Sequence, residues 1–413
     1  MERFGEPVEA CQICGSKKIH ECFYLGHQPP SDSFLKEEHL KKEEIAYPLD
    51  IYFCEDCNLL QLGYIVNPRE LFYEGYSYNT QTSGELVRNF TELTSKVISK
   101  FNISKNDLVI DIGSNDGTLL ENFFKREIRV LGIEPTGVAR LAIEKKIPTL
   151  KKFFEEDLAE EIIKQYGRAK IITATNVFAH IKKINSITKG IEKLLADDGV
   201  FISESHYLLD LIEKMEYDSI YHEHLRYYSL KPLTKLFEMN DMKVFDAERI
   251  TTHGGSIRVY ACKKGAYSIS DNIREIIETE KKAGLYSKDT FVDYGKKVKK
   301  SRERLMKTLN EIKEREKSIV GIGAPAKGNT LLNYCHINEN LIDYLAEKSE
   351  LKRGLFSPGM HLKVVDEEIM FKEPQPDYAL ILAWNLKDII IPKIKAKGFR
   401  GKFIIPVPTP YII

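Results

Sequence analysis

The sequence predicts an α/β protein in three parts: a metal-binding module, a central Rossmann-like domain and a smaller C-terminal Rossmann-like domain. Three observations predict this fold class. Two C-x-x-C pairs lie near the N-terminus. From residue 107 to about 262, apolar runs alternate with helix-favouring segments, which is typical of a doubly wound parallel sheet. A second strand, glycine turn and helix begin at Ser318. We place the parts at residues 1–80, 81–265 and 266–413, with a helical linker over 266–316.

Composition excludes several classes of partner. The 413 residues carry 61 basic and 61 acidic side chains, so the overall charge attracts neither nucleic acid nor an anionic membrane. No apolar run approaches the length of a membrane span, and the N-terminus lacks the apolar core of a signal peptide. We therefore expect a cytoplasmic protein. Seven cysteines, four of them in C-x-x-C pairs, favour a metal over disulfides.

The two pairs, Cys11 with Cys14 and Cys54 with Cys57, predict a structural zinc site. Four thiolates can occupy the corners of a tetrahedron, which suits Zn²⁺ and leaves no open position for catalysis. The long gap between the pairs predicts an intervening loop or hairpin. Cys22 is expected to be a bystander.

Residues 68–83 are aromatic and polar without clean periodicity, which predicts a loop or cap over another part of the molecule. A helix from Gly84 to about Lys100 then leads into the strand that begins the central domain.

That strand is followed by the turn Asp111-Ile-Gly-Ser-Asn-Asp-Gly-Thr118, and a helix can start directly after it. The glycine at 113 allows a ligand to approach the backbone, and the acidic side chains of the turn disfavour phosphate and favour a cation. The next strand, 129–134, ends on Glu134, which can hold the two hydroxyls of a ribose. The turn and Glu134 resemble the S-adenosylmethionine (SAM) site of a class I methyltransferase; another nucleotide-binding α/β turn is the alternative. The expected cofactor residues are Asp111, Gly113, Asn115, Asp116, Gly117, Thr118, Glu134, Pro135 and Asn176.

Further strands are expected near 147–151, 170–175 and 199–204. Two β-like runs, 243–250 and 256–262, can pair antiparallel, as at the sheet edge of class I methyltransferases. The basic run within 296–305 is interspersed with acidic residues, so it indicates a solvated helix face rather than a surface for nucleic acid.

The turn that follows the strand at 319 contains Lys327 and no acid, which suits a phosphate at a helix N-terminus. It is not a P-loop, because the lysine precedes Gly328 at a short spacing. Strands near 341–346, 376–383 and 401–406 are expected to complete a small sheet, and the prolines at 406, 408 and 410 are expected to end regular structure.

The segment Ser219-Ile-Tyr-His-Glu-His-Leu-Arg-Tyr-Tyr-Ser229 is the most distinctive polar cluster. A neutral histidine is a plausible general base near pH 7, and tyrosine hydroxyls can donate to a developing oxyanion. A metal site or a polar surface turn are the alternatives.

Several motifs together resemble the sugar C-methyltransferases of deoxysugar biosynthesis, which act on nucleotide-linked 4-keto-6-deoxyhexoses. They are the two cysteine pairs, the turn at 111–118, Tyr221-His-Glu-His224, Thr252-His-Gly-Gly-Ser-Ile-Arg258, Gly323-Ala-Pro-Ala-Lys-Gly-Asn-Thr330, Ser357-Pro-Gly-Met-His361 and Ala383-Trp-Asn385.

The resemblance spans nearly the whole chain. It implies a zinc-binding N-terminal module, a central class I SAM-methyltransferase domain and a C-terminal domain that helps to hold the nucleotide-diphosphate sugar. It implies His224 as the base, with Tyr221, Glu223, His180 and Tyr76 lining the sugar. Tyr78 could align in place of Tyr76. The expected substrate-binding residues are Tyr78, His222, Lys327, Asn329, Lys352 and His361. The loop 346–355 departs from the usual Asn-Pro version, which leaves nucleotide and sugar selectivity open.

The function predicted from the sequence is therefore SAM-dependent C-methylation of such a sugar, with deprotonation at C3. Alternatives are O- or N-methylation of a nucleotide sugar, an RNA methyltransferase, or a non-catalytic zinc- and nucleotide-binding protein. The sequence leaves open the nucleotide, the sugar, the position and stereochemistry of methylation, the pathway and the oligomeric state, for which a monomer is one option.

Overall fold

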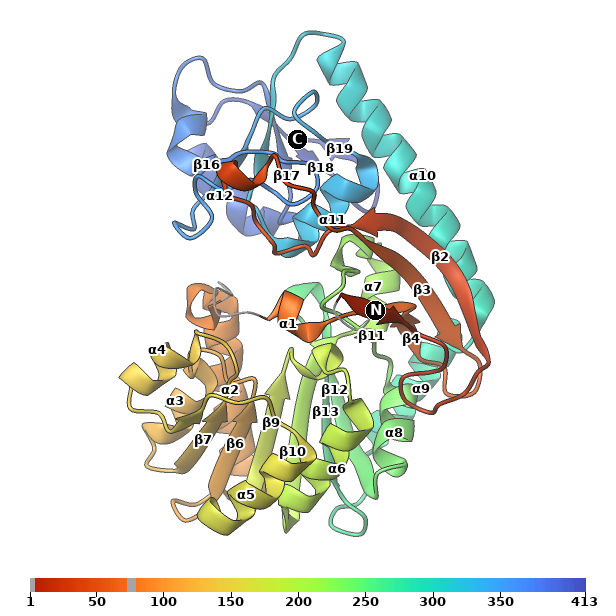
Figure 1. The fold of residues 1–413 in the computed structure, drawn as a ribbon, viewed down its shortest axis with the longest axis vertical. Helices are drawn as coiled ribbons and strands as arrows, with labels where there is room; N and C mark the ends of the chain where they lie inside the picture. The colour runs from red at the N-terminus through yellow and green to blue at the C-terminus, as the bar shows by residue number, and fades with distance from the viewer. Residues whose placement is uncertain (1–3, 73–78) are drawn as a thin grey trace.

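The computed structural model describes residues 4–72 and 79–413. Figure 1 shows the central sheet at one end of the molecule, the C-terminal sheet at the other and the N-terminal strands beside the space between them. One buried apolar cluster contains residues from all three parts, so they share a core. None of the helices in the described part of the chain is both long and apolar enough to cross a membrane.

The expected parallel sheet forms the centre of the protein. Its seven strands have the order β12-β13-β10-β9-β6-β7-β8. Strand β13 runs antiparallel to both of its neighbours, and the other six strands run in the same direction. The strands are β6 Leu108–Ile112, β7 Arg129–Ile133, β8 Thr149–Leu150, β9 Ala169–Thr175, β10 Leu195–His206, β12 Met242–Ile250 and β13 Ser256–Lys263.

Helices cover both faces of this sheet, as the alternating pattern predicts (Figure 1). Their apolar stripes are buried and their charged faces are exposed. The helical segments are α2 Gly84–Phe101, α3 Thr118–Phe124, α4 Ala139–Glu144, α5 Glu156–Tyr166, η3 Phe178–His180, α6 Ile184–Leu194, α7 Leu208–Glu213, η4 Tyr217–Ser219, α8 Leu230–Glu238 and η5 Thr252–Gly254.

The N-terminal module, which we define as residues 4–72, is built on a four-stranded antiparallel sheet of order β11-β4-β3-β2. The edge strand β11, Arg226–Tyr227, comes from the predicted catalytic segment and was not expected from the sequence. The module's own elements are β1 Gly5–Pro7, β2 Ile19–Gln28, η1 Glu37–His39, β3 Tyr47–Cys54, β4 Leu60–Leu62, β5 Tyr64–Val66 and α1 Pro68–Leu71; η2, Thr80–Thr82, follows.

Two helices, α9 Asp271–Lys282 and α10 Lys288–Lys313, form the linker. Helix α10 runs along β2 of the N-terminal module toward the C-terminal sheet (Figure 1). The contact is close because Gly295 has no side chain: a Cβ there would lie 2.5 Å from the Cβ of Phe23. The rings of Phe53 and Phe291 add a contact with centroids 5.2 Å apart.

The C-terminal sheet has six strands in the order β16-β15-β14-β17-β18-β19. Two predictions were wrong here. The prolines do not end regular structure, because β19 follows them and pairs antiparallel with β18. The strand predicted near 341–346 is shorter and lies later in the chain, at Leu345–Glu347. Strand β16 was missed. The elements are β14 Ile319–Ile322, α11 Ala326–Cys335, β15 Leu345–Glu347, β16 Val364–Asp366, η6 Glu367–Phe371, β17 Tyr378–Ile381, η7 Trp384–Leu386, α12 Lys387–Ala396, β18 Lys402–Ile405 and β19 Tyr411–Ile412.

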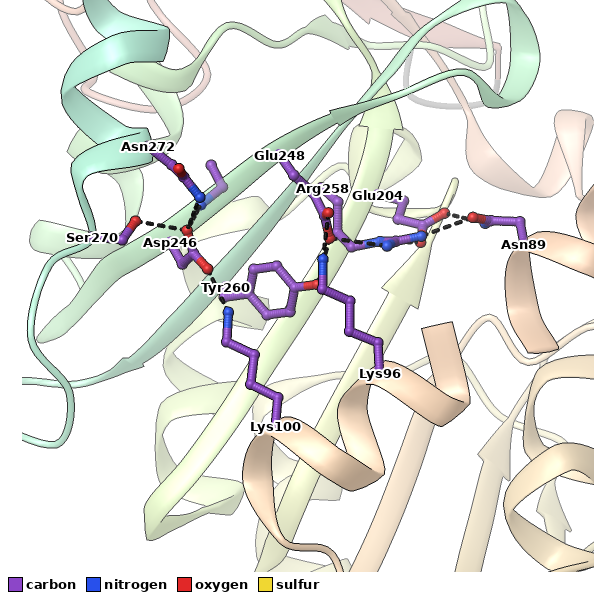
Figure 2. Close-up of polar contacts among 11 residues, drawn as sticks. Asn89, Lys96, Lys100, Glu204, Asp246, Glu248, Arg258, Tyr260, Ser270 and Asn272 are labelled. Carbon is purple, nitrogen blue, oxygen red and sulfur yellow. Dashed lines mark hydrogen bonds and ion pairs between the residues drawn. The ribbon is translucent and has the colours of Figure 1, made fainter. Parts of the chain in front are cut away.

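A buried polar network fastens α2 to the edge of the central sheet (Figure 2). Arg258 on β13 donates to Glu204 on β10 at 2.6 Å and to Asn89 on α2 at 2.8 Å, and Asn89 donates back to Glu204 at 2.9 Å. Burial raises the pKa of the Glu204 carboxyl, and the guanidinium of Arg258 opposes that shift. Around this centre, Lys96 and Tyr260 both bind Glu248.

Replacing Arg258 by leucine should destabilise the protein by about 3–5 kcal/mol, because Glu204 would remain buried without its partner charge. Chemical denaturation followed by circular dichroism measures this loss. The matched control removes Lys105, whose ion pair with Glu127 is exposed on both sides and should contribute little. Equal stability of the two variants would show that the network does not hold α2.

Candidate active site

A cleft of about 1050 Å³ lies at the carboxyl ends of the parallel strands, between the central and C-terminal sheets. All three parts of the chain contribute to its lining: Asp32 comes from the N-terminal module, Asp111 and His224 from the central part, and Lys327 from the C-terminal part. The cleft is large enough for two ligands of nucleotide size in contact.

The first glycine turn forms one wall of this cleft. Gly113 and Gly117 have φ angles of +73° and +77°, in the left-handed region that favours glycine. A Cβ at Gly113 would lie 2.4 Å from a methyl group of Val177, so no other residue fits there. Asn115 also has a positive φ, and its side-chain oxygen accepts from the amide and hydroxyl of Thr80.

Two carboxylates behind the turn have different partners. Glu134 accepts from the amides of Asn115 at 3.0 Å and Thr136 at 2.9 Å, and a carboxylate can accept further bonds from a ribose. Asp111 accepts from the hydroxyl of Thr173 at 2.6 Å, and burial raises the pKa of the Asp111 carboxyl to about 7. The two carboxylates thus make this turn suitable for a positively charged ligand that carries a ribose.

Asp116 is fully buried and fixes the turn from inside. Its two oxygens accept from the amide of Thr118 at 3.0 Å and from the amide of Gln81 at 2.8 Å, so it joins the first residue of α3 to the segment before α2. Pro135 and Asn176 complete the lining of this wall, and the amide of Asn176 donates to the carbonyl of Glu204.

His224 faces the same cleft, and its ring is held by a backbone contact. Its Nδ1 lies 2.9 Å from the carbonyl oxygen of Ser219, which can only accept, so the proton sits on Nδ1 and Nε2 keeps its lone pair. The ring centroid is 4.2 Å from that of Tyr221 and 4.9 Å from that of His180. Burial lowers the pKa of His224 well below its usual value and that of His180 to about 4, so both rings are neutral at pH 7.

Of the other residues expected at the sugar, Glu223 also lines the cleft. Tyr76 and Tyr78 lie outside the described residues.

The second glycine turn forms the opposite wall. Gly323 has a φ of +83°, and the amide of Ala324 donates to Glu347 at 2.7 Å. Lys327 lies in the first turn of α11, with its ammonium 4.5 Å from the ring of Trp384. Lys352 also lines the cleft, but its ammonium is already paired with Asp32 at 2.8 Å. A phosphate at this wall would therefore meet backbone amides and Lys327 first.

Three expected substrate residues lie away from the cleft lining and hold the N-terminal module in place. His222 is buried against the carbonyl of Pro48 at 3.3 Å, Asn329 donates to the carbonyl of Ser31 at 2.6 Å, and His361 pairs with Glu44 at 2.9 Å. Their polar groups form hydrogen bonds or ion pairs with residues from distant parts of the chain.

Several cleft residues were missed from the sequence. His206 and His253 both line the cleft, as do Asp32 and Glu347. A signal existed for three of them. His206 and Glu347 stand at the ends of strands, where α/β ligands bind, and His253 lies in the motif at 252–258.

The four predicted metal ligands converge. Their sulfurs all lie within 4.8 Å of one another, with Cys11 and Cys57 at 3.4 Å and Cys14 and Cys54 at 3.6 Å. Tetrahedral thiolates around Zn²⁺ at about 2.3 Å stand ~3.8 Å apart, so this donor set fits a closed structural zinc site.

The zinc site connects to the predicted catalytic segment through one short strand pair. The second knuckle leads into β4, whose Leu60 and Gln61 pair with Tyr227 and Arg226 of β11. The amide of Leu62 also donates to the carbonyl of Leu225, next to His224. The metal module thus carries one side of the segment that presents His224.

Comparison with known proteins gives three matches to family models. A zinc binding domain matches residues 11–72, a methyltransferase domain matches 79–246, and a C-methyltransferase C-terminal domain matches 251–408. The C-methyltransferase NovU from Streptomyces niveus is 30% identical over 416 residues, which cover 100% of this chain and 99% of NovU.

Among solved structures, a SAM-dependent methyltransferase from Clostridium acetobutylicum is 14% identical and covers 43% of this chain and 92% of its own, with a TM-score of 0.36. Magnesium protoporphyrin IX methyltransferase from Synechocystis, with bound SAH, is 15% identical and covers 43% and 83%, with a TM-score of 0.33.

Metal analysis should find about one zinc per chain, the content of one Cys₄ site. Cys54→Ala should lose this zinc and speed amide exchange at Leu62, because the knuckle supports β4; calorimetry should show SAM affinity largely retained. Cys22→Ala is the matched control, since Cys22 lies outside the sulfur cluster. Zinc-free wild-type protein, or a Cys54→Ala variant with unchanged exchange at Leu62, would contradict this view.

Proposed function

The chain belongs to the family of SAM-dependent C-methyltransferases with an N-terminal zinc-binding module, and we propose that it methylates C3 of a nucleotide-linked 4-keto-6-deoxy sugar. The observation that carries this proposal is the pairing of two unlike glycine turns across one cleft. One turn is acidic and ends beside Glu134, and the other is followed by Lys327. A sulfonium nucleoside suits the first, and a diphosphate suits the second.

Carbon methylation needs a base, because a C–H bond next to a ketone must first be broken. Nε2 of His224 keeps its lone pair, and burial keeps the ring neutral and ready to take the proton. The carbonyl of Ser219 fixes the tautomer. Proton abstraction leaves an enolate with its charge on the C4 oxygen.

Hydroxyl donors beside His224 stabilise that enolate. Tyr221 packs directly against the His224 ring, so this tyrosine lies on the same side of the sugar as the base. Glu223 and His180 complete the polar surroundings. Glu223 is buried and the other three residues are half-buried, so little water competes for the charge.

The acidic wall holds the cofactor. Glu134 binds the ribose hydroxyls, the backbone at Gly113 lies against the nucleoside, and Asp111 favours the positive charge. Bound SAM supplies a methyl group that the enolate carbon of the sugar can accept. The two walls place both ligands in one cleft, and such positioning provides much of the acceleration.

The similarity to the C-methyltransferase NovU supports carbon as the methylated atom, and the second glycine turn supports a diphosphate as part of the substrate. The side chain of Lys327 and the backbone amides of Ala326 and Lys327, at the N-terminus of α11, hold the diphosphate. Glu347, at the end of β15, stands where an acid accepts from ribose hydroxyls in Rossmann-like domains.

The two walls can be separated by calorimetry. Glu134→Gln should weaken SAM roughly 10-fold or more, because a charged acceptor is lost, and should leave binding of nucleoside diphosphates unchanged. Lys327→Ala should show the reverse. A panel of uridine, thymidine and guanosine diphosphates serves as the probe. Weaker SAM binding in Lys327→Ala with intact diphosphate binding would show that the walls are assigned the wrong way round.

A 4-ketosugar nucleotide deuterated at C3 tests the reaction itself. The methylated product should lose the deuterium, because C-methylation must break that bond, whereas O- or N-methylation does not. His224→Ala should lower turnover by roughly 10²–10⁴, the usual contribution of a positioned base, with SAM binding retained. Retention of deuterium by the wild type would overturn C3 methylation, and normal turnover of His224→Ala would remove only the base.

A further inference from the structure

A second histidine stands in the cleft with a buried carboxylate behind it. His206 is the last residue of β10, and its Nε2 lies 2.7 Å from Oε2 of Glu216, which has no exposed surface. A carboxylate only accepts, so Nε2 carries a proton. Among the described residues, the other ring nitrogen of His206 makes no hydrogen bond, and the ring lines the cleft.

The chain is shaped around Glu216. Gly254 has a φ of +93°, and a Cβ there would lie 2.6 Å from Oε1 of Glu216. The neighbouring Gly255 leaves room in the same way for the buried Asp210. The Gly-Gly pair of the motif at 252–258 therefore makes space for two buried acids. The buried carboxylate of Glu216 is therefore held in one position, where it binds His206.

Two polar atoms beside this pair lack partners within the described part of the chain. Oε1 of Glu216 and Nε2 of His253 are both buried without a hydrogen bond. A buried polar atom left unpaired costs about 1–3 kcal/mol, which a bound polar ligand can recover. Because His253 lines the cleft, its unpartnered Nε2 indicates that a ligand with a polar group completes this end of the cleft.

We propose that His206, held by Glu216, donates a proton to the C4 oxygen of the sugar while His224 removes the proton from C3. This rests on the proposed C3 methylation. The two histidines differ in their backing: His224 faces a neutral carbonyl, whereas His206 faces a carboxylate, which stabilises an imidazolium. An imidazolium compensates the enolate charge, which a neutral tyrosine hydroxyl does not.

The proton balance is closed. The C3–H bond breaks and its proton goes to Nε2 of His224, while the C4 oxygen takes the proton from Nδ1 of His206. C3 then bonds to the methyl carbon, whose bond to sulfur breaks with the electron pair left on sulfur. The ketone re-forms and its proton returns to His206. One proton, that on His224, is released to solvent.

His206 must be protonated for this role, so its charged neighbours matter. The titratable groups that face it are Glu216, His253 on the 252–254 turn and His224 across the cleft. Burial lowers the pKa of His253 to about 4, so this ring is neutral at pH 7 and does not repel a charged His206.

The experiment combines steady-state kinetics with the C3-deuterated substrate. His206→Asn should lower kcat by roughly 10²-fold, the lower end for a positioned acid. Glu216→Gln should lower kcat while KM stays unchanged, because the imidazolium loses its carboxylate. Affinities for SAM and for nucleoside diphosphates should remain those of the wild type.

His20→Asn is the matched control, since His20 pairs with Glu55 at 3.0 Å on the N-terminal module, away from the cleft. Thermal denaturation and SAM binding show whether each variant is folded; should Glu216→Gln fail to fold, His206→Asn decides alone. Wild-type loss of deuterium with an unchanged kcat in His206→Asn would overturn the role of His206. Retention of deuterium by the wild type would instead overturn the C3 reaction.

Discussion

The strand pair between β4 and β11 is the contact on which the site depends. Because Leu60 and Gln61 bind the backbone of residues 226–227, the segment that presents His224 is at the same time the edge of the zinc-bearing sheet. The amide of Leu225 donates on its other side to the carbonyl of Ala179, next to His180. The two histidines are thus held by contacts to one short segment of the chain. The zinc takes no part in the reaction, but its module supports the geometry of the site.

The two glycine turns that form walls of the cleft are held by the same kind of hydrogen bond but carry side chains of opposite charge. In each, a carboxylate at the end of the neighbouring parallel strand accepts the backbone amide of a glycine turn: Glu134 from Asn115, and Glu347 from Ala324. This bond fixes the turn before any ligand arrives. What differs is the rest of the turn, where Asp111 and Asp116 stand on one side and Lys327 on the other. The two turns therefore have similar backbone structures, and the charged side chains on each turn determine which ligand it favours.

Local signals were enough for the central sheet, the helix over 84–101 and the four cysteines, because strand periodicity, glycine turns and C-x-x-C spacing act within a few residues. Partners far away in the chain were not predictable. His361 binds Glu44 and Asn329 binds Ser31 across about 300 residues, and a motif cannot show whether its polar group faces a ligand or another part of the chain. The same limit hid β19, whose pairing with β18 overrides the local effect of three prolines. His206 was missed because its partner Glu216 belongs to no motif.

Burial sets the charge of the whole cleft. It lowers the pKa of His180 and His253 to about 4 and that of His224 further below its usual value, so three rings can lie together without repulsion. The same dry surroundings raise the pKa of Asp111 to about 7, so that carboxyl gains most from a ligand that brings positive charge. His206 differs from these rings because the buried carboxylate of Glu216 lies behind it. The cleft thereby gives two of its histidines unlike partners, a backbone carbonyl behind His224 and a carboxylate behind His206, and these partners favour different charge states of the ring.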